Sequence, residues 1–312
     1  NAKIIYDSLA KRNVFKEKYF EIELDIPEPS IDDPNCHYNR FILAFCTELG
    51  INISEINKVK IELPQIRELS KILKNDSKVW VKYRKEKDGS IEILQIHDGN
   101  HKGIFGIAID LGTTTIVGYM YNMINGELIG QHATINPQVE IGEDMVTRLT
   151  HIAQNNSLNS TAALAKKGIN SIIKEICNKN NIPELLVYEA VLVGNTAMHH
   201  IFFEMETYKL AVSPYIPVTK NSLYVSNFDV NLVMNPIGKI YSPPIIAGYV
   251  GGDTVACIEA TQFKDIKEYT MMIDIGTNGE IVIGNKDIGM YAGSVAAGSA
   301  LEGAHISSGM RA

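Results

Sequence analysis

The sequence is poor in cysteine, and its cysteines are not arranged as metal ligands. The chain of 312 residues contains four, Cys36, Cys46, Cys177 and Cys257, and no two of them form a Cys-x-x-Cys pair. Zinc and iron–sulfur sites need closely spaced thiolates. We therefore expect free thiols in a reducing cytoplasm, with Cys177 and Cys257 buried on helices.

Long apolar runs are also absent. The sequence has no stretch of about 18 apolar residues, the length that a membrane-spanning helix requires. Its first residues, Asn1-Ala-Lys-Ile-Ile, lack both an initial Met and the basic-then-apolar layout of a signal peptide. We expect a cytoplasmic chain without membrane contact, which lies inside a longer protein or begins after processing.

The chain has no surplus of positive charge. Its formal net charge is −7 at pH 7, which disfavours a nucleic-acid partner. The hydrophobic content of 45% and the charged content of 21% are ordinary for a globular protein. A chain of this length suffices for two or three domains.

One short pattern occurs twice. An apolar run ends in Asp and is followed by x-Gly-Thr, a polar turn and a second apolar run, at residues 106–115 and again at 271–280. The Gly lets backbone N–H groups approach a phosphate, and a Thr or Asn adds a further donor. One such turn arises by chance in many hairpins, whereas two indicate a duplicated fold whose halves face one nucleotide.

The aspartates of this pattern, Asp110 and Asp274, are the candidate metal ligands and catalytic carboxylates. Mg²⁺ keeps several waters and needs only one or two carboxylates beside the phosphates. One carboxylate can also orient the attacking water. The alternative is that each Asp caps its own turn. The candidates for phosphate binding are the other residues of the two turns, for which ordinary turn chemistry is the alternative: Gly112, Thr113, Thr114, Thr115, Gly276, Thr277 and Asn278.

Further candidates lie outside the two turns. Asn195 and Thr196 occupy a predicted strand-to-helix junction, where a helix N-terminus attracts anions or where a side chain simply caps the helix. Four acids are candidates for activating water, and each could instead cap a helix or turn: Asp144, Asp253, Glu143 and Glu280.

Two other features suggest packing rather than chemistry. His199 and His200 have no partner at metal-ligand spacing, so we expect a packed or surface pair. The segment 292–299 has almost no side-chain bulk, and we favour a tight turn over a surface that contacts a partner.

Hydrophobic periodicity divides the chain into regions. Residues 1–17 read as a linker, and residues 18–100 as a small α/β domain. In the latter we expect strands at 20–26, 59–63, 79–83 and 91–96, helices at 38–49 and 64–73, and a hairpin turn at Asp88-Gly89.

Residues 104–265 read as a larger α/β lobe, and 266–312 as the start of a second lobe. The first lobe has expected strands at 104–110, 115–121, 127–135, 188–193 and 245–247, and helices at 144–153, 162–177, after 194–196 and at 252–262. Residues 213–244 are expected to form an extended excursion with short strands. The second lobe has expected strands at 271–274, 280–283 and near 290, and a helix at 299–308.

The two Asp-x-Gly-Thr turns resemble those of the actin-like ATPase superfamily, in which the two loops clamp ATP from opposite lobes. Other segments narrow the resemblance. In their order along the chain, these segments are similar to motifs of the ATP-dependent reductive activators of corrinoid proteins. The resemblance runs from about Tyr19 to the end of the chain. The segments are 136–138, 142–148, 193–200, 213–217, 247–253, 296–303 and 309–312.

The resemblance implies an α/β fold of actin-like, ribonuclease H-like ATPase lobes, the second incomplete, preceded by a small α/β middle domain. It implies ATP and Mg²⁺ as cofactors and a corrinoid protein of a methyl-transfer system as partner. The activity would be the ATP-driven return of cobalt(II) to cobalt(I). The family's upstream [2Fe–2S] ferredoxin domain is not in this sequence, nor is the superfamily's adenosine-binding Gly-Gly segment or a corrinoid-binding Asp-x-His-x-x-Gly signature. This chain would supply the nucleotide switch and the partner surface, and by itself would be a weak or inactive ATPase.

Two other functions fit the same fold. A small-molecule kinase would need a catalytic Asp near a substrate hydroxyl, a role open to Asp144 or Asp253. A non-catalytic scaffold would only bind partners, but the presence of both Asp110 and Asp274 argues against it. A homodimer is one assembly that the sequence leaves open.

Overall fold

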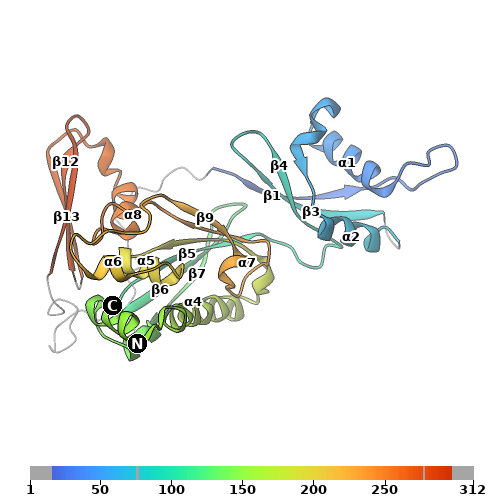
Figure 1. Cartoon of the computed structure of the whole chain (residues 1–312). Helices are drawn as coiled ribbons and strands as arrows, with labels where there is room; N and C mark the ends of the chain where they lie inside the picture. The colour runs from blue at the N-terminus through green and yellow to red at the C-terminus, as the bar shows by residue number, and fades with distance from the viewer. Residues whose placement is uncertain (1–15, 75–76, 277, 297–312) are drawn as a thin grey trace. The chain divides into compact units, whose positions relative to one another are not determined.

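The computed structural model describes residues 16–74, 77–276 and 278–296, which fold into two compact units (Figure 1). One unit comprises residues 16–105 and 121–128, and the other comprises residues 106–120 and 129–296. The expected helix at 299–308, most of the expected linker at 1–17 and the phosphate-binding candidate Thr277 lie outside the described residues. In the part of the chain that is described, no helix is both long and apolar enough to span a membrane.

The smaller unit is a sheet with two helices, as the sequence predicts. Its strand order is β1-β3-β4-β2, and the β3–β4 hairpin turns at Gly89, whose φ of 80° suits glycine. The elements are β1 (Tyr19–Asp25), α1 (His37–Glu48), the 3₁₀ helix η1 (Ile53–Lys58), β2 (Val59–Lys60), α2 (Leu63–Ile72), β3 (Lys78–Lys85) and β4 (Ile91–His97).

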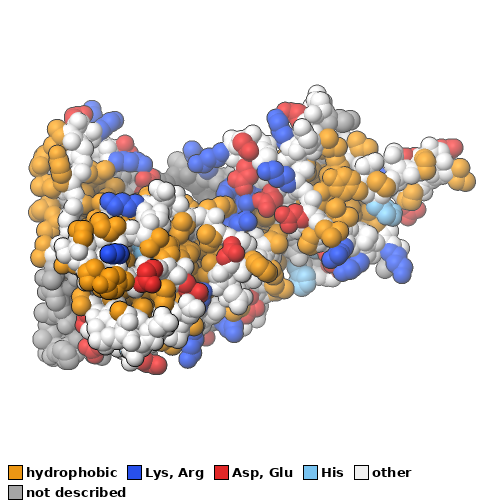
Figure 2. Space-filling model, viewed as in Figure 1, with side chains coloured by type: hydrophobic (Ala, Val, Ile, Leu, Met, Phe, Trp, Pro, Cys, Tyr) orange, Lys and Arg blue, Asp and Glu red, His pale blue; other side chains and the backbone are white. Residues whose placement is uncertain are grey.

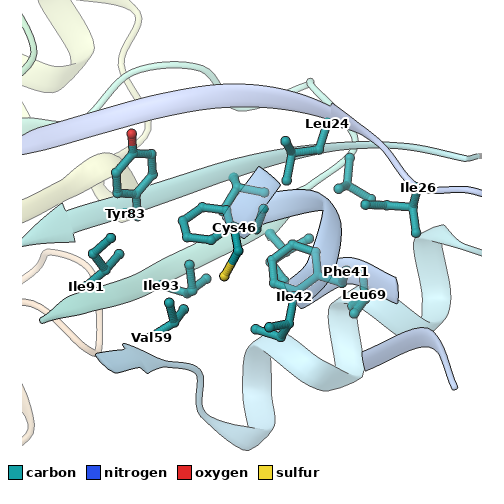
Figure 3. Close-up of a cluster of buried hydrophobic side chains, with 14 residues drawn as sticks. Leu24, Ile26, Phe41, Ile42, Cys46, Val59, Leu69, Tyr83, Ile91 and Ile93 are labelled. Carbon is teal, nitrogen blue, oxygen red and sulfur yellow. The ribbon is translucent and has the colours of Figure 1, made fainter. Parts of the chain in front are cut away.

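The core of this unit lies between the sheet and the two helices (Figure 3). Phe41 and Phe45 of α1 stack on each other, and the ring of Phe45 meets Tyr83 of β3 edge-on at 5.2 Å. Strand β3 contributes the alternate residues Val79, Val81 and Tyr83 to this core, although Lys82 and Arg84 beside them are buried as well. The unit therefore has a hydrophobic core of its own.

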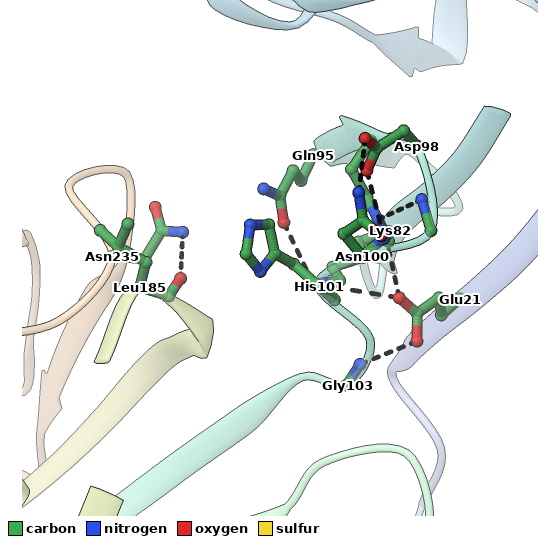
Figure 4. Close-up of polar contacts among 11 residues, drawn as sticks. Glu21, Lys82, Gln95, Asp98, Asn100, His101, Gly103, Leu185 and Asn235 are labelled. Carbon is green, nitrogen blue, oxygen red and sulfur yellow. Dashed lines mark hydrogen bonds and ion pairs between the residues drawn. The ribbon is translucent and has the colours of Figure 1, made fainter. Parts of the chain in front are cut away.

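Charged side chains tie the exit of the small unit to its first strand (Figure 4). The Glu21 carboxylate accepts a hydrogen bond from the Gly103 N–H at 2.9 Å and lies 3.0 Å from His97 Nε2. Lys82 is fully buried and donates to Gln95 and to the carbonyl of His101. Burial lowers the pKa of Lys82 to about 8, although the nearby Glu21 opposes the change.

The larger unit contains a sheet of six strands in the order β7-β6-β5-β8-β10-β9. Strand β10 runs parallel to β8 and antiparallel to β9. The strands are β5 (Phe105–Leu111), β6 (Thr115–Asn122), β7 (Leu128–Ile135), β8 (Val187–Val193), β9 (Leu223–Ser226) and β10 (Lys239–Ser242). The helices are η2 (Pro137–Glu140), α3 (Met145–Asn155), α4 (Leu158–Asn180), η3 (Glu184–Leu186), α5 (Thr196–Phe202), α6 (Tyr208–Ala211), α7 (Asn227–Val230), α8 (Gly252–Ala260) and η4 (Phe263–Asp265).

Helix α4 covers one face of this sheet. Its apolar side is fully buried, and it packs so closely that a Cβ at Gly118 of β6 would lie 2.6 Å from Ile172. The helix is longer at both ends than the expected 162–177, because residues at its ends continue the helix without being part of the apolar stripe.

One strand of the sheet was predicted at the wrong place. Residues 245–247 do not form a strand, and Ala247 makes only an isolated antiparallel bridge with Val250. The strand that pairs with β8 is instead β10, inside the expected excursion. Its four residues are followed directly by Pro243 and Pro244, so the sequence offers only a short signal there.

A second sheet of three consecutive antiparallel strands follows, formed by β11 (Thr270–Ile275), β12 (Asn278–Asn285) and β13 (Gly289–Ala296). Hydrophobic side chains gather on its surface (Figure 2), among them the exposed Met271, Ile273 and Tyr291. The small residues 292–296 are part of β13, so the expected tight turn at 292–299 is wrong for these residues. The rest of that segment lies outside the described residues.

Candidate nucleotide site

Four carboxylates from four elements of the larger unit affect one another's charge. Asp110 is near the end of β5, Asp253 is the second residue of α8, Asp274 is on β11 and Glu280 is on β12. The nearby charges of Asp253 and Asp274 act on both Asp110 and Glu280. The structure thus brings together Asp110, Asp274 and Asp253, which the sequence predicts as site residues, with Glu280 beside them.

Ionisation of this carboxylate cluster is unfavourable in the folded protein. The Asp110 side chain reaches solvent, yet the protein around it removes hydration from the charged form. That loss of hydration, together with Asp253 and Asp274, raises the pKa of Asp110 to about 7. Burial is also the main cause that raises the pKa of Asp253 to about 6 and that of Glu280 to about 7. A bound cation would relieve this repulsion.

Three of the polar side chains form a row across the second sheet. Asp274 is paired directly with Glu280 in the register of β11 and β12, and Glu280 is paired with Ser294 of β13. Directly opposed residues project from the same face of a sheet. The Ser294 hydroxyl donates to the Glu280 carboxylate at 3.0 Å, so the row ends in a hydrogen bond that orients Glu280.

A thiol lies next to this row. Cys257 of α8 is half-buried, and its Sγ is 4.0 Å from the Asp274 carboxylate. Burial and the four carboxylates raise the pKa of Cys257 to about 12, so it is a protonated thiol at neutral pH. All four cysteines are free, as expected, although Cys257 is less buried than predicted.

The first turn, Gly112–Thr115, is fixed by Asn136. The Asn136 side chain donates to the Gly112 carbonyl at 2.8 Å, and its backbone N–H donates to the Thr114 carbonyl at 2.8 Å. A Cβ at Gly112 would lie 2.4 Å from the carbonyl oxygen of Thr115, so only glycine permits this backbone path. The turn is therefore rigid and tightly closed.

Asn195 joins this turn to the next helix. Its Oδ1 caps α5 by accepting from the Met198 N–H, and its Nδ2 donates to the Thr113 hydroxyl at 2.9 Å. Thr196 is fully buried, and its hydroxyl donates to the Ala247 carbonyl at 2.6 Å. Both residues thus have the capping and packing roles that the sequence left as alternatives, and Asn195 in addition contacts the turn.

Two further glycines bring α8 against the same loop. The Gly194 carbonyl accepts from the N–H groups of Gly252 and Asp253. A Cβ at Gly251 would lie 2.5 Å from both Asn195 Cα and the Gly194 carbonyl oxygen, and one at Gly194 would lie 2.8 Å from the Leu111 carbonyl oxygen. Backbone contact between these segments therefore places Asp253 beside the first turn. The N-cap of α8 is Gly251, without a side-chain cap, so Asp253 does not cap the helix.

Asp144 lies elsewhere and acts as a helix cap. It is exposed and accepts from both the N–H and the hydroxyl of Thr147 at the start of α3. The hydrogen bond from the Thr147 N–H is the main cause that lowers the pKa of Asp144, and burial acts in the opposite direction. No described contact joins Asp144 to the carboxylate cluster, and its neighbour Glu143 is exposed as well.

The second turn closes tightly, because the Gly276 N–H donates to the Asn278 carbonyl at 2.8 Å. Asn278 begins β12. The turn thus brings Asp274 and Glu280 opposite each other.

His199 and His200 are packed residues, one of the two alternatives expected. His200 Nδ1 donates to the Thr196 carbonyl, and its Nε2 accepts from the Val218 N–H. This pattern makes His200 a neutral bridge that joins α5 to the segment after residue 217.

The sequence does not predict a site role for Arg148 or Gln138, which are both fully buried behind the first turn. The signal was present. Arg148 shares the inward face of α3 with Met145, Leu149 and Ile152, and an arginine at an apolar position of a helix is unusual.

The residues present fit a nucleotide with a hydrated Mg²⁺. The Gly112 turn leaves room only for backbone, and the carboxylate cluster lacks a compensating positive charge among its described neighbours. Within the described ranges, no group of three or more His, Cys, Asp or Glu side chains is placed to hold a metal ion by itself. Mg²⁺ does not need such a group, since phosphates and waters complete its coordination.

The fold and the paired turns define a protein of the actin-like (ASKHA) class. Residues 105–266 match the family model of the RACo middle region, and residues 268–312 match that of the C-terminal domain of RACo, the ASKHA domain. The chain therefore belongs to the RACo family of reductive activators of corrinoid proteins.

Two relatives agree with this assignment. The corrinoid activation enzyme RamQ of Eubacterium limosum is 37% identical over 211 residues, which are 67% of this chain and 35% of RamQ. A solved structure titled reductive activator for corrinoid, iron-sulfur protein is 31% identical, with a TM-score of 0.81 over 97% of this chain and 48% of that one. The chain thus spans less than half the length of either relative.

Proposed function

We propose that this chain is the nucleotide switch of an ATP-dependent reductive activator, which returns a corrinoid protein from cobalt(II) to cobalt(I). The relatives carry this activity in their names. The observation that supports it here is the carboxylate cluster, to which residues of both Asp-x-Gly-Thr turns contribute. In this proposal, residues 18–100 form the small α/β domain that precedes the part matched by the RACo middle-region model, 104–265 form the first ATPase lobe, and residues from 266 on belong to the second.

The site residues have defined roles in this proposal. Asp110 and Asp274 hold hydrated Mg²⁺, while Asp253 and Glu280 bind its waters or the attacking water. The first turn, together with Gly276 and Asn278, surrounds the phosphates. Asn195 holds the Thr113 hydroxyl in place.

Each cobalt(II) takes up one electron to become cobalt(I), and ATP is hydrolysed by water to ADP and phosphate. An iron–sulfur domain of the cytoplasmic full-length protein would supply the electron. The nucleotide would supply the free energy by changing the affinity of the two lobes for the corrinoid partner.

Cobalt spectroscopy tests this function. The full-length protein, a low-potential reductant and a cobalt(II) corrinoid protein are mixed with and without MgATP. We expect the cobalt(I) absorbance to rise only with MgATP, and to stay absent when a non-hydrolysable analogue replaces it. Equal cobalt(I) with and without nucleotide would contradict the proposal, and ATP-dependent phosphorylation of a small molecule would favour a kinase.

A further inference from the structure

Arg148 is a buried arginine whose guanidinium touches the first phosphate turn from behind. Its side chain is fully buried, and Nη2 donates to the Thr113 carbonyl at 2.6 Å. Nε donates to the Gly142 carbonyl at 2.8 Å, and Nη1 lies 3.2 Å from Gln138 Oε1 and 3.4 Å from Met198 sulfur. All four contacts are to neutral groups.

A buried charge with neutral partners is costly, because the carbonyls and amide replace water only in part. Burial lowers the pKa of Arg148 to about 10, with Asp144 opposing the change, so the guanidinium stays charged at neutral pH. A neutral side chain could fill the same space without this cost. The charge and the directed donors of Arg148 therefore call for a role beyond filling the core.

The hydrogen bonds from Arg148 and Asn136 fix the orientation of the peptide groups in the first turn. The carbonyls of Gly112, Thr113 and Thr114 accept from Asn136 and Arg148, so all three face the protein interior. In a trans peptide the N–H of the next residue points opposite to the carbonyl. With the Thr113 carbonyl turned inward by Arg148, the following N–H is directed to the outer side of the turn, where an anion would bind.

We infer that Arg148 is the positioning residue of the first phosphate turn. It holds the turn with carbonyls inward and N–H groups outward before nucleotide arrives, and it sets a fixed positive charge behind the phosphates. This inference rests on the proposed function only in its assumption that the site takes a nucleotide. In this role Arg148 acts through the turn and does not contact the nucleotide.

The chain offers a matched control in Arg40. That arginine is also nearly buried, at 4% exposure, and donates to the carbonyls of Asn35, Pro27 and Glu28. It differs in that it also pairs with the Asp33 carboxylate at 2.8 Å, and it belongs to the smaller unit. Arg148→Lys and Arg40→Lys each keep a positive charge and remove a forked set of donors. A loss of stability is expected from both, whereas a loss of nucleotide affinity is expected from Arg148→Lys alone.

The test is calorimetric titration of the full-length protein with MgADP and with MgATP, beside thermal unfolding without nucleotide. We expect Arg148→Lys to weaken nucleotide binding roughly tenfold to a hundredfold, the range set by one lost charge-assisted hydrogen bond. Arg40→Lys should bind within about twofold of the natural protein at a similar loss of thermal stability. Hydrogen exchange at residues 112–115 should quicken in Arg148→Lys only.

The binding measurements separate a failure of the positioning role from a failure of the proposed function. A folded Arg148→Lys that binds nucleotide like Arg40→Lys would overturn the positioning role. If the unaltered protein binds neither nucleotide, the proposed function fails instead. If Arg148→Lys does not fold, Gln138→Met decides, since it keeps the arginine but removes one acceptor that orients it. That variant should lose at least threefold in nucleotide affinity, and unchanged binding would overturn the inference.

Discussion

Asp110 combines access to solvent with a raised pKa. Its carboxylate is reachable from outside, yet loss of hydration and two neighbouring aspartates resist its ionisation. A cation that binds there would offset both the lost hydration and the repulsion from the two aspartates. The affinity for the metal therefore depends on how closely the carboxylates are spaced. The same reasoning sets Asp110 apart from Asp144, whose carboxylate is already satisfied by the start of α3.

We expect Asp110→Asn to abolish Mg²⁺-dependent ATP hydrolysis by the full-length protein. An amide cannot supply the negative charge that holds the metal, and the loss of one strong electrostatic group lowers turnover roughly 10²- to 10³-fold. Phosphate release measures this. Asp144→Ala is the comparison: it should cost about 1 kcal/mol of stability through the lost cap and leave turnover within about threefold. Unchanged hydrolysis by a folded Asp110→Asn protein would remove Asp110 from the site.

His199 makes stability depend on pH. It is buried at 3% exposure, and its Nε2 has no hydrogen-bond partner in the described structure. Burial, followed by the neighbouring His200, lowers the pKa of His199 to about 4. Below pH 6.5 the unfolded chain binds a proton at this residue that the folded chain does not, so stability falls as the pH drops toward 4.

Urea unfolding at pH 7.5 and pH 5.0 measures this effect in the natural protein and in His199→Phe. Between pH 7.5 and 5.0 the natural protein should lose about 2 kcal/mol more than the variant. The carboxylates with raised pKa values change the stability in the opposite direction as the pH falls. Their contribution is the same in both proteins, so it cancels in the comparison. Equal pH dependence of the two proteins would show that His199 is already protonated or is exposed to solvent.

At the scale of elements, the second sheet aligns side chains by register. Asp274, Glu280 and Ser294 come from three strands and face the same way, which their sequence separation alone does not indicate. Only the pairing of β12 with both neighbours creates the row. A one-residue slip of β13 would turn Ser294 to the other face.

We expect Ser294→Ala to lower ATP turnover by about threefold to tenfold, because Glu280 loses the hydroxyl that orients it, a change of about 1 kcal/mol. Nucleotide affinity should change little, since among the described residues no hydrogen bond joins Ser294 to either turn. Ser294→Thr keeps the hydroxyl and should retain most of the turnover. Full activity of the alanine variant, at unchanged thermal stability, would show that Glu280 needs no such support.

The sequence predicts much of the fold at this scale but less of the site. Alternation and helical spacing correctly predict the strands of the small unit, α3, α4 and the three strands of the second sheet, since each has a strong local pattern. Short strands are expected in the excursion that contains β10, but its place in the sheet is not predicted, because only four residues precede two prolines. The roles of Arg148 and Asn136 are missed because their contacts to the turn span 35 and 24 residues. Local patterns carry no information on such long-range hydrogen bonds.

At the scale of the whole molecule, the chain contains two units with separate cores. The only tryptophan, Trp80, belongs to the smaller unit, where the Lys102 ammonium lies 3.7 Å from the centre of its ring. Its fluorescence therefore reports on the small unit, whereas far-ultraviolet circular dichroism reports mainly on the larger unit, which holds most of the helix.

We expect nucleotide binding to raise the Tm measured by circular dichroism but not the Tm measured by Trp80 fluorescence. At a hundredfold excess over its Kd, MgATP stabilises the unit that binds it by about 2.7 kcal/mol, which raises its Tm by about 5 °C or more. The dichroism transition of this 312-residue chain should shift by this amount, while the Trp80 transition should stay within about 1 °C. Equal shifts of both signals would show that the two units unfold together.

The close approach at Gly112, Gly194 and Gly251 has a consequence for how the gene can vary. At each position a single added carbon would meet backbone atoms at 2.8 Å or less, and a backbone cannot rotate aside as a side chain can. A library of all single substitutions, selected for survival, should therefore contain no viable variant at these three codons. An organism that has abandoned the activity is freed from that restriction. Reading these three codons in a genome would then distinguish a working gene from one in decay.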